Sequence, residues 1–424
     1  MSPPTESRLL LAARILLLML PLCLISGRAG VDIDLSLIAI LFLVRSVMRR
    51  DWAWAASTWF KIGLGLWVWT LVVSLFAFDT GLSFSQAAPW IRFLLFAAAL
   101  EVWVLDEVWM RRLLWVITAT LVLTAVDCLI QYFHGVDLFG HPRWGPERLS
   151  AMFDRPRVGI FIVKLMFPAV FGAFAWRAWR RGRLRPALAF AGLVLLLLSA
   201  IFLSGERMAL LLALLGLVLG AVLQRGPLRA LVVGAASLGI VGMIALALLS
   251  PLMITRHVDE TRNTLAHFGD SAYAVIWGSG LDMIETHPLL GAGMKNFRLV
   301  CPTLDLPVRA DLRCSTHPHN LYLEWGAEAG IPGLAGFVLL IGAMFRQLWR
   351  TASRHGYGVW MLGPMVSMVV HLWPLGPTGS FFSNWAAAMF WLAVGWAFAA
   401  ARVQEATPAM ERVPPRGQPW LEAR

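Results

Sequence analysis

The chain has 424 residues, of which 58% are hydrophobic and only 14% are charged, and its formal net charge is +11. A soluble globular chain usually carries about a quarter charged residues, so this composition excludes an ordinary soluble domain and indicates a membrane protein. The positive charge does not indicate nucleic-acid binding, because the arginines stand in short clusters between apolar runs, as they do where they set membrane topology.

Apolar windows long enough to cross a bilayer recur along almost the whole chain. A hydrocarbon core of about 30 Å requires roughly 20 apolar residues per helix, so we predict an all-α polytopic membrane protein with about twelve transmembrane helices. The first run, Leu9 to Ile25, follows Arg8 as in a signal peptide, but similar runs come after it and we expect a retained span. The predicted spans are 9–27, 31–47, 60–78, 86–105, 112–133, 158–176, 186–203, 207–223, 230–253, 319–345, 359–375 and 382–401.

The orientation of these spans follows from the distribution of basic residues, because loops rich in Lys and Arg remain in the cytoplasm. The loops near 79–85 and 376–381 contain neither residue, which indicates an even number of spans with both termini cytoplasmic. We expect the Pro-rich tail, 406–424, to be a disordered cytoplasmic end. The basic loops contain Arg45, Arg49, Arg50 and Lys61, then Arg111 and Arg112, then Arg177, Arg180, Arg181, Arg183 and Arg185, then Arg225 and Arg229, then Arg350 and Arg354.

Two loops on the non-cytoplasmic side carry many charges and are the predicted location of function. We divide the chain into membrane helices over 1–253 with a short outer loop near 134–157, a large outer loop over 254–318 that forms a helical cap, and further membrane helices over 319–405. The sequence leaves open whether Cys301 and Cys314 of the large loop form a disulfide, which the non-cytoplasmic side permits.

His319 begins the segment in which the large loop re-enters the membrane. It is expected near a helix N-terminus, where the positive end of the helix favours a neutral imidazole. A neutral imidazole is suited to act as a general base. The alternative is a histidine that only forms hydrogen bonds at the membrane surface. His317 stands two residues earlier, but no carboxylate pair is near, and we predict no metal site.

Arg207 follows the polar break Ser204–Glu206 between two apolar runs. A full charge at that depth is costly, so we favour an anion-binding role over a side chain that only reaches to the membrane surface. A diphosphate is the natural ligand because guanidinium donors match phosphate oxygens. Further arginines that either join this cluster or are solvated loop charges are Arg148, Arg155 and Arg157.

The segment 287–293 contains two glycines in a predicted turn. The backbone amides of such a turn could bind an anion, but we favour a purely structural turn.

Three segments together resemble the O-antigen ligase and polymerase superfamily of bacterial surface-polysaccharide assembly. The resemblance covers roughly residues 140 to 340 at the level of motifs and the whole chain at the level of topology. The matching segments are His319, Asn320, Gly330 and Gly333, the H-P-L-L-G-A-G run at 287–293, and the turn Ser204–Arg207.

This resemblance implies a GT-C-like membrane enzyme of the bacterial inner membrane with a periplasmic active site. It implies an undecaprenyl diphosphate-linked O-antigen as donor and, for the ligase branch, the lipid A-core oligosaccharide as acceptor. It also implies a metal-independent and inverting transfer without a cofactor, in which His319 is the base and arginines hold the diphosphate. The residues expected to support His319 are His317, Asn320, Tyr322, Glu328, Gly330 and Gly333.

The sequence departs from the superfamily pattern at two places. Tyr273 stands where many members have an arginine, and 154–157 replaces a common Pro-Asn pair. The second diphosphate-binding arginine is therefore sought among Arg262, Arg256 and Arg157.

An O-antigen polymerase or a protein O-oligosaccharyltransferase with the same donor is the alternative within this enzyme class. A transporter of the lipid-linked glycan is the alternative outside it. Transport is disfavoured because the charges gather at one face instead of lining a path across the membrane.

Overall fold

The computed structural model describes residues 3–172, 184–224, 227–304 and 314–406, and every regular element in these ranges is a helix. The principal helices are α1 (Pro3–Ser26), α2 (Arg28–Arg49), α3 (Thr58–Leu75), α4 (Thr80–Ala87), α5 (Ile91–Ala99), α6 (Glu107–His134), α7 (Val158–Leu165), α8 (Phe167–Phe171), α10 (Leu184–Leu203), α11 (Arg207–Leu223), α12 (Pro227–Leu249), α13 (Pro251–Ile254), α14 (Glu260–Ala266), α15 (Ala272–Thr286), α16 (Phe297–Val300), α18 (Leu321–His355), α19 (Leu362–His371) and α20 (Asn384–Ala406).

The all-α polytopic class is confirmed. Within the described residues, 8 helical segments are long and apolar enough to cross a membrane, and shorter apolar helices cover Val158–Phe171, Arg207–Leu223 and Leu362–His371. The predicted span 31–47 corresponds to α2, which carries charged residues within its apolar run. The predicted span 158–176 is broken into α7 and α8 in its described part. The arginines from 177 to 183, Arg225 and nearly all of the tail lie outside the described residues.

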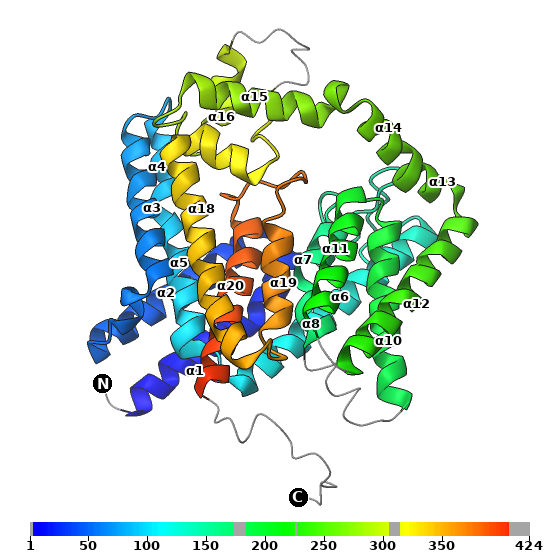
Figure 1. Ribbon diagram of the computed structural model, residues 1–424, viewed down its shortest axis with the longest axis horizontal. Coiled ribbons are helices and arrows are strands. Elements are labelled where there is room, and N and C mark those ends of the chain that lie inside the picture. Colours follow the sequence, from blue (N-terminus) through cyan, green and yellow to red (C-terminus); the bar gives the residue numbers. More distant parts are fainter. Residues whose placement is uncertain (1–2, 173–183, 225–226, 305–313, 407–424) are drawn as a thin grey trace, which may run out of the picture.

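The membrane helices form two groups (Figure 1). One group contains α2, α3, α5, α18 and α20, and the other contains α6, α7, α10, α11 and α12. Helix α19 packs on both α20 and α11 and so joins the groups. Helices α13 to α16 lie across one end of the molecule. They belong mostly to the loop 254–318, and we call them the cap.

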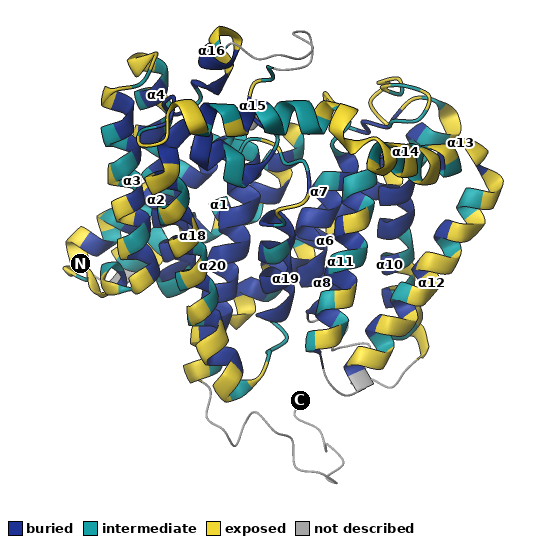
Figure 2. Cartoon of the chain, turned by 45° about the horizontal axis from the view of Figure 1, so that its top comes forward, coloured by how far each residue is buried: buried dark blue, intermediate teal, exposed yellow. Residues whose placement is uncertain are grey.

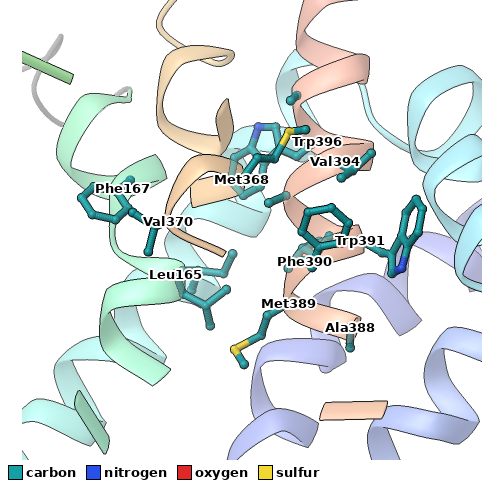
Figure 3. Packing of buried hydrophobic residues seen from close by; sticks show 14 of the residues in the cluster. Leu165, Phe167, Met368, Val370, Ala388, Met389, Phe390, Trp391, Val394 and Trp396 are labelled. Carbon is teal, nitrogen blue, oxygen red and sulfur yellow. The ribbon is translucent and has the colours of Figure 1, made fainter. Parts of the chain in front are cut away.

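Helix α20 is the centre of the apolar core. It is hydrophobic around its whole circumference, which is typical of a helix that is buried on all sides. Figure 3 shows Phe390 of α20 facing side chains of α7, α8 and α19, whereas Trp391 points to the opposite side of the helix, where its ring lies 5.9 Å from that of Trp90 between centroids. Figure 2 shows that exposed residues gather on outer helices such as α12. Exposed apolar residues such as Leu248 suit a surface that faces lipid.

A kink in α18 joins two of the sequence motifs. Gly330 has φ +70°, a value that favours glycine, and interrupts the helical backbone. The turn 288–293 packs into this gap, where the amides of Ala292 and Gly293 donate to the carbonyls of Ala327 and Glu328 at 2.9 and 3.0 Å. The glycines of both motifs therefore serve a close backbone contact, as the structural-turn interpretation of 287–293 predicts.

Replacing Gly330 with Ala should destabilise the protein. The new Cβ would collide with the carbonyl oxygen of Leu289, and the backbone angle is unfavourable for alanine. We expect a loss of about 1 to 3 kcal/mol, measured by thermal unfolding in detergent. Gly342→Ala is the matched control, because this glycine of the same helix has open space around it and should lose no stability. Equal stability of the two variants would contradict the account of the kink.

Candidate active site

His319 lies where α18 begins, as predicted. Asn320 is the N-cap residue of this helix, and its side-chain oxygen accepts hydrogen bonds from the amides of Tyr322 (3.0 Å) and Leu323 (3.2 Å). His319 itself has φ +53°, which is uncommon for a residue with a side chain. This conformation is fixed by the N-cap residue Asn320 that follows it and by the loop 372–383 that covers it.

The imidazole of His319 is half-buried beside His317. Its Nε2 lies 3.0 Å from Oγ of Ser315, and the two imidazole rings are 4.1 Å apart between centroids. Burial, together with His317, lowers the pKa of His319 to about 4, because a charged ring loses hydration there. His319 is therefore neutral near pH 7 and has a nitrogen lone pair available.

A loop between α19 and α20, 372–383, holds this helix start in place. The amide of Thr378 donates to the carbonyl of His319 at 2.7 Å, and the carbonyl of Thr378 lies 3.1 Å from Nε2 of His317. Asn320 donates to the carbonyl of Pro374 and the Tyr322 hydroxyl to that of Leu372, each at 2.8 Å. The sequence contains no charged residue in this loop. The absence of Lys and Arg indicated only that the loop lies on the non-cytoplasmic side, and it did not indicate a contact with His319.

Arg207 begins α11 directly after the polar break. Its Nη1 donates to Oγ1 of Thr264 at 3.2 Å and lies 3.8 Å from Oε2 of Glu260. Both partners belong to α14, so the arginine ties the membrane helices to the cap. The break is tight because Gly205 has φ +70° and approaches the backbone of Glu147.

Glu206 does not pair with its neighbour Arg207. Its carboxylate accepts from the amides of Gly159 (2.7 Å) and Ile160 (3.2 Å) at the start of α7. Burial raises the pKa of Glu206 to about 7 despite these hydrogen bonds and the nearby Arg148 and Arg157, which lower it.

The other candidate arginines differ in their positions. Arg256 donates to the carbonyl of Gly205 at 3.1 Å and forms an ion pair with Glu260, so it meets Arg207 at a shared carboxylate. Arg157 lies 3.8 Å from Asp154, and its guanidinium is over the ring of Trp385. The structure therefore joins Arg207 with Arg256.

Arg262, the remaining candidate, is exposed on α14. A cleft of about 330 Å³ opens beside Arg207. The cap supplies its other walls, including His267 and Tyr273. Tyr273 is the residue that departs from the superfamily pattern, and it lies in the same cleft as Arg207. Sequence reasoning missed His267 and Thr264 as neighbours of Arg207, because their separation along the chain gives no local signal.

Loop 372–383 connects two clusters of residues, one around His319 and the other around Arg207. Gly376 of this loop packs against Met208, the residue after Arg207, so closely that a Cβ on Gly376 would lie 2.6 Å from the Met208 terminal methyl. Thr378 of the same loop contacts His319. Figure 1 shows the loop, in orange, between the start of α18 and α11. His319 and Arg207 are thus brought to the same end of the membrane helices.

The remaining supporting residues hold the scaffold. Glu328 is buried, and its carboxylate accepts from the amide of Lys295 at 2.6 Å. Gly333 lies near Trp69, whose indole donates to the carbonyl of Ala329 at 2.9 Å. Glu328 and Gly330 therefore hold the turn against α18, and Gly333 packs against Trp69 of α3.

The cap contains one covalent link among the described cysteines. Cys301 and Cys314 form a disulfide with Cα atoms 5.7 Å apart, which resolves the question that the sequence left open. Within the described ranges, no group of three His, Cys, Asp or Glu side chains comes together in a way that could hold a metal ion.

The architecture and the paired clusters define a polytopic helical membrane protein with a polar site at the capped end. Residues 191–338 match the family described as O-antigen ligase, a region that contains both Arg207 and His319. This match supports the assignment to the O-antigen ligase and polymerase superfamily that the motif resemblance predicts. A comparison with curated proteins finds no match.

Glu206 predicts a pH dependence of stability. Its pKa is raised from the ordinary 4.5 to about 7, so its stabilising contribution is fully present below pH 4.5 and is lost as the pH rises through about 7. The unfolding temperature of the wild-type protein, compared with that of Glu206→Gln, should therefore fall between about pH 5 and about pH 8. Glu107→Gln, at an exposed surface position, is the control and should leave the slope unchanged. If the difference in unfolding temperature between wild type and Glu206→Gln stayed constant with pH, the pKa of this carboxyl would not be raised by folding.

Proposed function

We propose that this protein is an O-antigen ligase that joins an undecaprenyl diphosphate-linked O-antigen to the lipid A-core oligosaccharide at the periplasmic face of the inner membrane. The observation that carries the proposal is the bridge from His319 through Thr378 and Gly376 to Met208, beside Arg207. The family match over residues 191–338 supports an enzyme of the ligase or polymerase type in general. The donor, the acceptor and the residue roles are the finer part of the proposal.

In the proposed reaction, the acceptor hydroxyl oxygen attacks C1 of the donor sugar from the face opposite the diphosphate. The C1–O bond to the phosphate breaks, undecaprenyl diphosphate leaves, and the configuration at C1 inverts. His319 accepts the hydroxyl proton at its ring nitrogen. A pKa of about 4 makes it a weak base in the free protein, but the negative charge of a bound diphosphate would raise this pKa toward the working pH. No step requires a metal or a cofactor.

The diphosphate is proposed to bind in the cleft beside Arg207. Charge builds up on the leaving diphosphate in the transition state, so a guanidinium held in place beforehand lowers the barrier. Arg256 shares Glu260 with Arg207 and is the second proposed contact. Arg256, Arg157 and Arg262 all lie outside the cleft lining, and Arg256 is preferred because it alone shares a carboxylate with Arg207.

The proposed orientation places this end of the molecule in the periplasm and both termini in the cytoplasm. The Cys301–Cys314 disulfide supports it, because disulfides persist in the periplasm and are rare in the cytosol.

Thiol labelling of intact cells tests this orientation. Reduction should expose two additional thiols, at Cys301 and Cys314, to a maleimide that does not cross the membrane. The double variant with serine at both positions should lose this increase. If reduction increased maleimide labelling only after the cells were lysed, the cap would lie in the cytoplasm, which would contradict the proposed orientation.

His319→Ala should reduce glycan transfer by about 100-fold or more, because the proton acceptor is removed. The assay uses purified protein, undecaprenyl diphosphate glycan and rough lipopolysaccharide with a chelator present. His355→Ala, at the other end of α18, is the control and should transfer normally. Normal attachment by His319→Ala would refute its role. Chain growth on the lipid carrier, without attachment to lipid A-core, would indicate a polymerase.

Arg207→Ala should raise the donor KM by roughly 10- to 100-fold, as expected for the loss of hydrogen bonds to a charged group. The assay is the same transfer reaction with the donor concentration varied. Arg350→Ala removes a cation from the opposite end of α18 and should leave the donor KM unchanged. An unchanged donor dependence in Arg207→Ala would count against the proposed diphosphate site.

A further inference from the structure

The segment 133–146 consists of the last two residues of α6 and an ordered loop that follows them. The polar groups of this segment point inward. Gln131 of α6 donates to the carbonyls of His141 and Pro142, each at 3.2 Å. Asp137 accepts from the amides of Phe139 (2.9 Å) and His141 (2.7 Å). The hydrogen bonds of the backbone are thus used to fix the loop, and its conformation does not depend on burying its own apolar side chains.

The apolar side chains of this loop point outward instead. Phe133 is 69% exposed and Phe139 63% exposed. A cluster of this kind on an ordered loop is unfavourable in water and marks a surface that is covered by another molecule. The other exposed large apolar residues of the loop are Val136, Leu138 and Trp144.

An open hollow of about 520 Å³ lies at this loop, and Phe133 is the one residue of the exposed apolar set that lines it. Its titratable lining residues are His134 and Arg143, both basic, and no acidic residue lines it. Arg143 is held by hydrogen bonds from Nε to the carbonyl of Gln131 at 3.2 Å and from Nη2 to that of Tyr132. The hollow thus offers a fixed guanidinium beside an apolar rim, which consists of Phe133, Pro142 and Pro146.

The loop lies at a membrane surface, because α6, one of the membrane-spanning helices, ends at His134. It is also tied to the Arg207 region. The amide of Leu149 donates to the carbonyl of Ser204 at 3.3 Å, and Glu147 lies 3.9 Å from Arg256. The hollow therefore opens at the end of the molecule that carries the candidate site.

We propose that this hollow binds the phosphate group of an anionic lipid, with the lipid's acyl chains covering the apolar rim. The charge of the lining residues favours a phosphate, and the exposed aromatic residues at a helix end suit the boundary between head groups and chains. The lipid is either a bilayer phospholipid or a phosphorylated glycolipid, which share this chemistry. The inference does not depend on the role of His319.

Lipid binding to the purified full-length protein tests this proposal. The protein in detergent is titrated with phosphatidylcholine, phosphatidylglycerol and bisphosphorylated lipid A, and lipids retained per protein are counted by native mass spectrometry. Wild type should retain an anionic lipid at a lower concentration than phosphatidylcholine. Phe133→Ser should weaken this retention by about tenfold, as expected for an exposed aromatic ring on the wall of the hollow that a lipid chain covers. Phe78→Ser, at a phenylalanine 69% exposed elsewhere, is the matched control and should retain the lipid normally.

A second variant tests the head group. Arg143→Gln, with its fold checked by thermal unfolding, should lose the preference for anionic over zwitterionic lipid. Retention of both anionic lipids would identify a phospholipid head-group site, and retention of lipid A alone would identify a glycolipid site. Equal retention of all three lipids by wild type, or equal effects of Phe133→Ser and Phe78→Ser, would overturn the proposal.

Discussion

The hydrogen bond from the Thr378 amide to the His319 carbonyl is the interaction on which the candidate site depends. It holds His319 in a left-handed backbone conformation that an unrestrained histidine seldom adopts. The same loop reaches α11 through Gly376 and Met208, so one short connection joins a helix of each membrane group. The imidazole is therefore placed relative to Arg207 by the packing of the whole bundle.

Electrostatics make the two clusters complementary. His319 is neutral because it is partly buried, whereas Arg207 lies beside the Glu260 carboxylate that it shares with Arg256. A diphosphate entering the cleft would bring negative charge toward both. It would be attracted by the arginines and would also make the imidazole a better proton acceptor. Ligand binding and activation of the base are thus coupled in the proposed mechanism.

The sequence was sufficient to predict the membrane helices, the helix start after His319 and the polar break before Arg207, because hydrophobic runs and polar breaks are local signals. It did not predict loop 372–383, whose contribution comes mainly from backbone groups that leave no trace in residue type. The partner of Glu206 was also missed, since the amides of Gly159 and Ile160 come close only in the folded chain. Tyr273 was noted as a departure, and its place in the Arg207 cleft required the three-dimensional structure.

The most direct test of the account is an experimental structure with an undecaprenyl diphosphate glycan bound. The account predicts the diphosphate within hydrogen-bonding distance of Arg207 in the cleft between α11 and the cap. It also predicts the C1 atom of the first sugar facing the His319 ring, with space between them for an acceptor hydroxyl. A diphosphate bound away from Arg207, or a sugar carbon with no access to His319, would contradict the view that these two clusters form one active site.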